Sequence, residues 1–242
     1  MEKLSQQKIK DLKKLQLKKH RDLQRLIYIE GETLVSDLLG QFPGLIEALV
    51  LDENKAHLFS DFKGQRWISS ERELQKLTQL KTAKMVNAVI RYPEAKPWQK
   101  GQKAILLDQI QDPGNLGTII RTADWFGIEH IFCAPNTTDY LNPKVIHASM
   151  ASAFRVNVHY QDLTALIEAN AASTFGAYMD GQDFQTIAPK SIDFLVLGHE
   201  GHGISPELGK LIGQRIGIMS KGRAESLNVA VAAGILLQHM SK

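Results

Sequence analysis

Apolar and polar positions follow one another along this chain in a pattern that predicts alternating strands and helices. In its second half, short apolar runs indicate buried strands, and apolar residues at helical spacing indicate helices between them. The strands are expected at 104–108, 130–134, 156–158, 174–179, 194–198 and 215–218, and the helices at 115–127, 143–151, 163–171 and 226–239. Such alternation is typical of an α/β fold with a parallel sheet covered on both faces.

The first half predicts a smaller α/β domain. Its pattern favours strands at 45–51, 66–69 and 85–90, and helices at 34–39 and 71–77. Residues 92–101 contain two prolines, a glycine and mostly polar residues, as a linker does. We therefore expect a domain boundary near residue 98, with a basic segment at 1–26, a first domain at 27–98 and a second at 99–242.

Positive charge is concentrated at the N-terminus. The whole chain has a net charge of +3, but residues 1–26 hold nine Lys or Arg and three acids, so the other 216 residues are net negative. Leucines recur in this segment partly at helical spacing, which predicts a basic helix or semi-ordered arm. Two interpretations stay open: a solvated helix face that aids solubility, or an arm that contacts nucleic-acid phosphates without selecting a sequence.

Composition excludes several classes of protein. At 43% hydrophobic and 23% charged residues the chain has the balance of a globular protein. It has no apolar run of the roughly 18 residues that a membrane span needs, and its lysine-rich start lacks the apolar core of a secretory signal. The single cysteine, Cys133, lies in an apolar run and is expected in the core. These features fit a cytoplasmic protein with no membrane partner and no disulfide framework.

The candidate chemistry begins between Leu107 and Gly127, LDQIQDPGNLGTIIRTADWFG. Turn-forming residues at 112–115 lead from a predicted strand into a predicted helix. Asn115 and Arg121 therefore lie at the start and in the middle of a helix that leaves the carboxyl end of a strand, where open α/β sheets bind ligands. Simpler roles are also open: Asn115 as the helix N-cap, and Arg121 as a surface residue.

Two later segments complete a pattern. Residues 197–205, LGHEGHGIS, form a glycine-bordered loop after an apolar run, and residues 216–219, IGIM, precede 225–232, ESLNVAVA. The three segments, in this order, resemble the signature motifs of the SpoU family of RNA ribose 2′-O-methyltransferases, in the SPOUT superfamily. The first domain more weakly resembles the substrate-binding domain often attached to these enzymes, through Glu30 and Gly31.

This resemblance implies a C-terminal domain with a deep trefoil knot, a rare exception to unknotted chains. It also implies that S-adenosylmethionine is the cofactor and lies bent in a cup formed by the three segments. Main-chain groups at Gly198, Ile218 and Leu227 would bind its adenosine part, between apolar side chains. The implied cofactor-binding residues are Leu197, Gly198, Gly201, Ile218, Met219 and Leu227. Without the motifs, ordinary core packing would explain Ile218 and Leu227.

The catalytic residues that the resemblance implies are Arg121, Asn115, Glu200, Ser226 and Asn228. Proposals for the family include the arginine as the base that activates the ribose hydroxyl. Because a guanidinium does not normally lose its proton in a protein, we favour another role for Arg121. It would grip the phosphate next to the target ribose and stabilise the negative charge that develops on oxygen. No metal site is expected, since His199 and His202 have no partner ligands at metal-binding spacing.

Three positions depart from the family pattern. His199 stands where Asn is usual, His147 where Arg is common, and Ala151 where Gly is common. These three departures leave open which RNA substrate is chosen, but they do not change the reaction that the resemblance implies.

The sequence thus predicts a methyltransferase that modifies a ribose 2′-hydroxyl in structured RNA. Ribosomal RNA is favoured over tRNA because of the first domain. The resemblance also implies a homodimer through the C-terminal domain, although core burial within one chain would equally satisfy the apolar helix at 226–239. The alternatives are a tRNA ribose methyltransferase and a non-catalytic RNA-binding or ribosome-assembly factor with the same fold.

Overall fold

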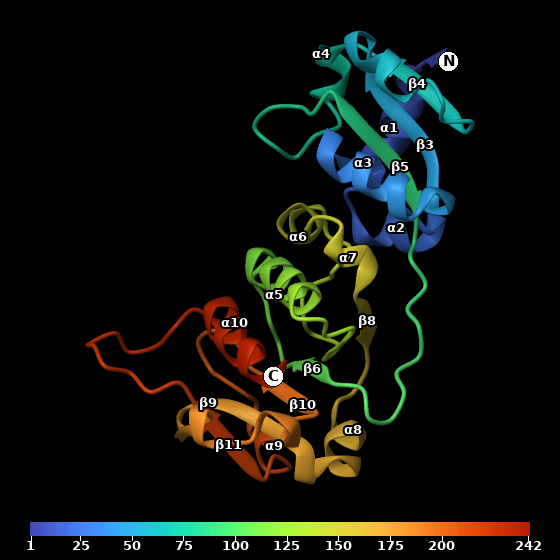
Figure 1. Ribbon diagram of the computed structural model, residues 1–242. Coiled ribbons are helices and arrows are strands. Elements are labelled where there is room, and N and C mark those ends of the chain that lie inside the picture. Colours follow the sequence, from blue (N-terminus) through green and yellow to red (C-terminus); the bar gives the residue numbers. More distant parts are fainter. The chain divides into compact units, whose positions relative to one another are not determined.

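The computed structural model describes all 242 residues, and contacts within the chain divide it into two units (Figure 1). Unit 1 comprises Met1–Pro93 and Leu141–His147, and unit 2 comprises Glu94–Tyr140 and Ala148–Lys242. None of the helices combines the length and apolar character that a membrane span requires.

Unit 1 contains a five-stranded mixed sheet in the order β1-β4-β3-β5-β2. Its strands are β1 (Glu2–Lys3), β2 (Leu26–Glu30), β3 (Ile46–Asp52), β4 (Gln65–Ser69) and β5 (Val86–Arg91). Strand β5 runs antiparallel to β2 and β3, whereas β4 is parallel to β1 and β3. The helices are α1 (Gln6–Lys14), α2 (Lys18–Gln24), α3 (Glu32–Gln41) and α4 (Glu71–Leu74), with 3-10 turns η1 (Pro43–Leu45) and η2 (Glu53–Phe59). The smaller α/β domain expected from the sequence is confirmed.

The basic segment at 1–26 forms two helices that help to build the core of unit 1. Four apolar residues of the segment, Leu4, Ile9, Leu12 and Leu15, are buried in one cluster with residues of the sheet. Arg21 is also buried, and its guanidinium donates to the carbonyl oxygens of Leu15 and Gln16, which fixes the turn between α1 and α2. Most of the lysines of the segment stay exposed.

Unit 2 is built on a six-stranded sheet in the order β11-β9-β10-β6-β7-β8. The strands are β6 (Ala104–Leu107), β7 (His130–Cys133), β8 (Asn157–Tyr160), β9 (Thr174–Asp183), β10 (Phe194–Leu197) and β11 (Gln214–Gly217). Every pair is parallel. The central strands β6 and β10 contain only apolar residues, all buried, as a sheet covered on both faces requires. The predicted parallel sheet is confirmed.

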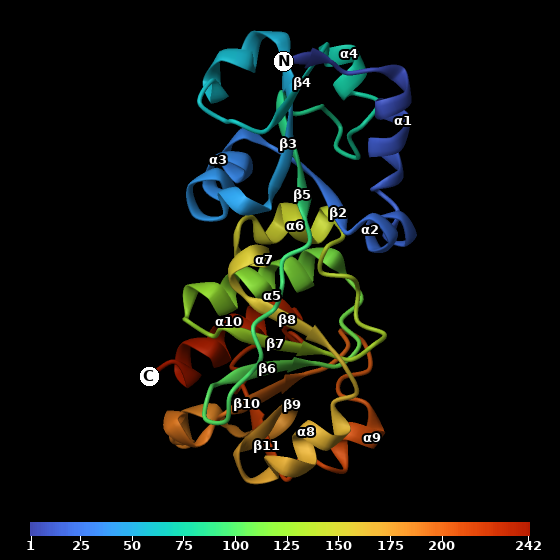
Figure 2. The same ribbon diagram turned by 90° about the vertical axis from the view of Figure 1, so that its right-hand side faces the viewer.

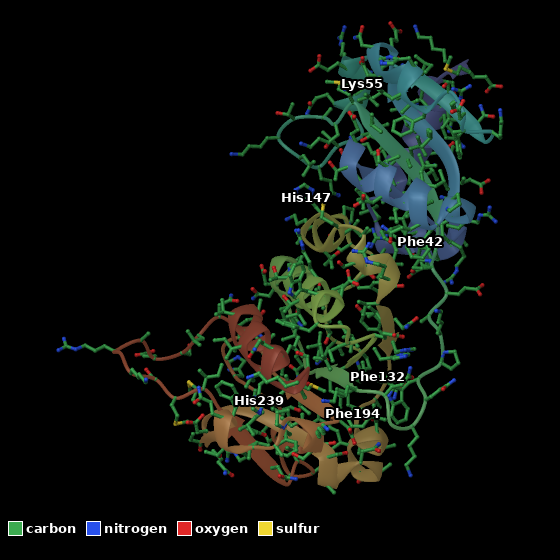
Figure 3. The ribbon with its side chains drawn as sticks, viewed as in Figure 1. Phe42, Lys55, Phe132, His147, Phe194 and His239 are labelled. Carbon is green, nitrogen blue, oxygen red and sulfur yellow. The ribbon has the colours of Figure 1, made fainter.

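Helices cover this sheet on both faces (Figure 2). The helices of unit 2 are α5 (Pro113–Trp125), α7 (Ser152–Arg155), α8 (Thr164–Ala169), α9 (Pro206–Gly209) and α10 (Val229–Met240), with 3-10 turns η3 (Ala171–Ser173), η4 (Phe184–Thr186) and η5 (Pro189–Ser191). Most of a further helix, α6 (Pro143–Ser149), belongs to unit 1. On one face, α8 and α9 contribute Ile167 and Leu208 to a cluster with sheet residues. On the other face, α5 and α10 contact each other. The ring of Trp98 packs against those of Phe132 and Phe194, with centroid distances of 6.4 Å and 5.4 Å. Figure 3 labels the two phenylalanines.

Two histidines face each other on neighbouring strands of unit 2. His130 Nδ1 and His159 Nε2 are 3.2 Å apart, and the rings are nearly parallel, at 11°. Burial lowers the pKa of both side chains. For His130, the nearby Glu129 opposes this shift and Lys96 adds to it. For His159, the neighbouring His130 lowers the pKa further.

We expect the free energy of unfolding to decrease on acidification because of this pair. A histidine whose pKa is lower in the folded than in the unfolded chain stabilises the fold above its unfolded pKa, about 6.5. That stabilisation is lost as the pH falls through the unfolded value towards the folded one. Urea unfolding at pH 7.5 and 5.5 measures how much the free energy of unfolding changes with pH, and His159→Gln should reduce this slope. The exposed His57→Gln is the matched control and should leave the slope unchanged; equal slopes in the wild type and His159→Gln would refute the assignment.

Candidate active site

A hydrogen-bonded chain joins three of the predicted catalytic residues from distant parts of the sequence. Asn115 Nδ2 donates to Glu200 Oε1 at 2.8 Å, and Asn228 Nδ2 donates to Asn115 Oδ1 at 2.9 Å. Asn115 belongs to α5, Glu200 to the loop after β10, and Asn228 to the start of α10. The three segments singled out in the sequence therefore meet at one place in unit 2.

Local capping explains how the two asparagines are held. The N-cap of α5 is Asp112, whose Oδ1 accepts from the Asn115 N–H at 2.8 Å. The interpretation of Asn115 as the cap is therefore wrong, and its side chain is free to join the chain of hydrogen bonds. Asn228 is the N-cap of α10, since its Oδ1 accepts from the N–H groups of Ala230 and Val231. The helix consequently begins at Val229, after the predicted start at 226.

The loop that carries Glu200 is closed by its own backbone. His199 N–H donates to the Gly203 carbonyl at 2.9 Å, and Gly203 N–H donates to the His199 carbonyl at 2.8 Å. Gly203 has a φ of +70°, which favours glycine there. Gly198 lies directly against the opposite side of the loop, because a Cβ on it would overlap the backbone of Gly203 and Ile204.

Asp108 connects this loop to the strand before α5, a role that the sequence analysis missed. It is 2% exposed; its Oδ2 accepts from the Ser205 N–H at 2.7 Å, and its own N–H donates to the Leu197 carbonyl at 2.9 Å. The signal was available, since a carboxylate directly after a buried strand needs a partner. Asp108 thereby holds the loops after β6 and β10 at a fixed separation.

His199 performs in this loop the task that an asparagine performs in an Asx turn. Its Nδ1 accepts from the N–H of Gly201, two residues ahead, at 2.9 Å. Its ring also stacks on that of His202, with 4.9 Å between centroids. The departure from the family pattern at this position therefore keeps the hydrogen bond that shapes the loop.

We expect His199→Asn to be tolerated and His199→Ala to impair the loop. Asparagine offers an acceptor to the Gly201 N–H, whereas alanine leaves that donor to water and weakens the turn. The measurement is the dissociation constant for S-adenosylmethionine, since the resemblance makes this loop part of the cofactor cup. We expect a change within twofold for the Asn variant and a loss of about fivefold for the Ala variant, equivalent to one hydrogen bond. Equal losses in both would show that ring stacking, not the acceptor, shapes the loop.

A cavity of about 480 Å³ lies between β9, β11 and the start of α10. Four predicted site residues line it: Ile218, Met219, Ser226 and Leu227. Further lining residues, which include Tyr178, Met179 and Leu236, lie outside the three motifs, and nothing in their local sequence pattern marks them as site residues. Met219 and Leu227 are 45% and 48% exposed, although both are apolar. The ordinary core role considered for Leu227 is therefore wrong.

Other predicted residues lie apart from this cavity or from the hydrogen-bonded chain. Leu197 is buried at the end of β10, and neither it nor Gly198 nor Gly201 lines the cavity. Ser226 lines the cavity without joining the asparagine chain. Arg121 lies six residues after Asn115 on α5, on a different side of the helix. Its side chain is exposed and has no hydrogen-bond or ion-pair partner. The structure places no group of three or more His, Cys, Asp or Glu side chains for a metal ion.

The architecture and the site define an α/β protein with a ligand cavity and a polar cluster at the loops of a parallel sheet. Residues 102–238 match the SpoU rRNA Methylase family, and residues 6–88 match the MRM3-like substrate binding domain. The chain belongs to the SpoU rRNA Methylase family.

Individual relatives cover nearly the whole chain. It is 36% identical to the 23S rRNA (guanosine(2553)-2′-O)-methyltransferase RlmP of Bacillus subtilis, over 99% of this chain and 98% of the relative. The crystal structure of an AdoMet-bound rRNA methyltransferase from Sinorhizobium meliloti superposes with a TM-score of 0.85 at 31% identity, over 99% of this chain and 96% of the other. Another solved structure, described as giving insight into the 2-OH methylation of C/U34 on tRNA, matches 57% of this chain with a TM-score of 0.50 and 25% identity.

Proposed function

We propose that this protein transfers a methyl group from S-adenosylmethionine to a ribose 2′-hydroxyl in ribosomal RNA. The observation that carries the proposal is the contact of Asn115 with Glu200 and Asn228, near an apolar cavity lined by Ile218 and Leu227. The full-length similarity to an enzyme named for 2′-O-methylation of 23S rRNA supports both the reaction and the substrate.

The cavity suits the adenosine part of the cofactor. Its walls combine apolar side chains with main chain at the end of β11, and an adenine needs apolar faces and backbone partners at its edge. The exposed Met219 and Leu227 gain cover when such a ring lies against them. When bound, S-adenosylmethionine supplies an electrophilic methyl group on its sulfonium.

The polar residues of the site have separate tasks in this proposal. Glu200 has Oε1 fixed by Asn115, while Oε2 makes no hydrogen bond and is available to a ribose hydroxyl. Arg121, which stays protonated, binds the adjacent phosphate and stabilises negative charge on the reacting oxygen. Ser226 and Asn228 line the ribose pocket. Holding the hydroxyl in line for displacement is the main contribution of such a site.

Unit 1 binds the RNA in this proposal. Its match to a substrate-binding domain supports this, as do the exposed lysines of α1 and α2, which can contact phosphates without selecting a sequence. The tRNA alternative is weaker because the tRNA-related structure covers little more than half of the chain. Ribosomal RNA is also the substrate named for a relative that matches 99% of this chain.

We also infer a homodimer through unit 2. Trp125 on α5 and Val231 on α10 are 83% and 52% exposed, and these two helices lie side by side. The segment before α10 is exposed from Lys221 to Asn228 and extends outwards within unit 2 (Figure 1). A second copy of the chain would cover these apolar side chains. The trefoil knot between β10 and α10 and a cytoplasmic location are part of the same proposal.

The decisive experiment is deletion of the gene in its host, followed by mapping of ribose methylation in total ribosomal RNA and tRNA. Loss of one 2′-O-methyl mark from ribosomal RNA, restored by the wild-type gene, is the expected result. Loss of a tRNA mark would keep the reaction and overturn the substrate. No change in either pool, together with failure of the purified protein to bind S-adenosylmethionine, would favour the non-catalytic RNA-binding factor.

A further inference from the structure

Helix α5 carries a second charged residue whose partners lie on α7. Asp124 Oδ2 accepts from Arg155 Nε at 2.8 Å and from the Ser152 hydroxyl at 2.6 Å. The Arg155 Nη2 is 2.7 Å from the same oxygen. The side chains of Asp124 and Arg155 are only 24% and 34% exposed. Three donors therefore converge on one carboxylate oxygen in a partly buried position.

The carboxylate is charged in this setting. Burial by itself would raise the pKa of Asp124, but the hydrogen bonds from Arg155 and Ser152 outweigh burial and lower the pKa below its ordinary value. A partly buried negative charge is thus matched by the guanidinium of Arg155 rather than by solvent.

Asp124 lies three residues after Arg121 on the same helix. At this spacing, side chains of opposite charge on a helix pair with each other. Yet Arg121 has no ion-pair partner, because the Asp124 carboxylate is directed to α7. The guanidinium of Arg121 therefore remains available for a phosphate.

We propose that Arg155 and Ser152 are positioning residues that hold and neutralise Asp124, and so keep Arg121 free to bind the phosphate beside the target ribose. This inference rests on the role of Arg121 in the proposed function. Without Arg155, the carboxylate turns to Arg121 and also repels the incoming phosphate. Both effects weaken RNA binding, and neither touches the cofactor cavity.

Three variants separate this role from simple bracing of α5 against α7. R155Q leaves the carboxylate unmatched, D124N removes its charge, and the D124N/R155Q double variant removes both members of the ion pair. Bracing alone predicts equal impairment in all three, since each breaks the same ion pair. Neutralisation predicts that R155Q is impaired, that D124N is close to wild type, and that the double variant regains activity.

The measurements are kcat and KM for methylation of ribosomal RNA, the dissociation constant for S-adenosylmethionine, and thermal unfolding of each variant. We expect R155Q to lower kcat/KM about fivefold, mainly through KM for RNA, as for an ion pair of about 1 kcal/mol. Cofactor affinity should stay within twofold, and the double variant should return to within twofold of wild type. Equal activities of R155Q and the double variant would overturn the proposal.

Further variants serve as controls for the role of the Arg155 charge and for the activity of the protein itself. Arg155→Lys keeps the positive charge and should retain activity within twofold, so a loss as large as that of R155Q would overturn neutralisation by charge. If R155Q does not fold, D124N decides: activity close to wild type supports neutralisation, and impaired activity overturns it. Wild-type protein and Arg121→Ala are assayed alongside. If the wild type itself does not methylate the RNA, the proposed function fails and this inference fails with it; if the wild type is active, only the inference is at stake.

Discussion

Replacing Arg121 with alanine is expected to reduce methyl transfer to RNA by about 10²- to 10³-fold, the cost of removing one charge-stabilising donor from an active site. The guanidinium is exposed, has no partner within the chain and lies on the helix that also carries Asn115. It lies outside the lining of the cavity formed by residues such as Ile218 and Leu227. Cofactor binding should therefore be almost unchanged while turnover is lost.

Single-turnover methylation with purified RNA, and calorimetric titration of S-adenosylmethionine, measure the two quantities separately. Arg121→Lys is the matched control, because an ammonium attracts phosphate but cannot make the two-point contact of a guanidinium. It should give intermediate activity. An Arg121→Ala variant that methylates RNA at nearly the wild-type rate would show that the active site is assigned wrongly.

Replacing Gly198 with alanine is the second change with a large expected effect. The added methyl group would overlap the backbone of Gly203 and Ile204, and backbone cannot rotate away as a flexible side chain can. The loop after β10 must then open, and both Glu200 and the contact of Asp108 with Ser205 move with it. We expect a loss of about 1–3 kcal/mol in the free energy of unfolding, as for overpacking elsewhere, and at least tenfold weaker binding of S-adenosylmethionine.

Gly201→Ala in the same loop is the matched control. A Cβ there would lie 3.6 Å from the His199 ring, an ordinary contact, and the backbone does not have a positive φ. Urea unfolding and cofactor titration of the two variants side by side test the difference. Equal losses in both would mean that the loop tolerates no side chain for reasons other than the contact at Gly198.

The sequence by itself predicted most of the secondary structure. The central strands β6 and β10 are continuous apolar runs, which are typical of strands buried on both faces in a parallel sheet. Helix α5 was equally clear, because turn residues precede a regular apolar stripe. Strand β2 (Leu26–Glu30) and the short helix α9 were not predicted, and other errors lie at helix ends. The helix expected at 226–239 begins at Val229, since its cap is Asn228 and side-chain capping is a local contact that apolar spacing does not reveal.

The residue types of the candidate site were also determined by the sequence, through three motifs in a fixed order. Their arrangement was decided only by the tertiary structure. Asn115 and Glu200 are 85 positions apart, and Asn115 and Asn228 are 113 apart, so no local pattern states that they share hydrogen bonds. The structure likewise assigned the cap of α5 to Asp112 and directed Asp124 to Arg155. Periodicity fixes which face of an element is buried, whereas polar contacts between elements depend on distances that exist only once the sheet and its helices have packed.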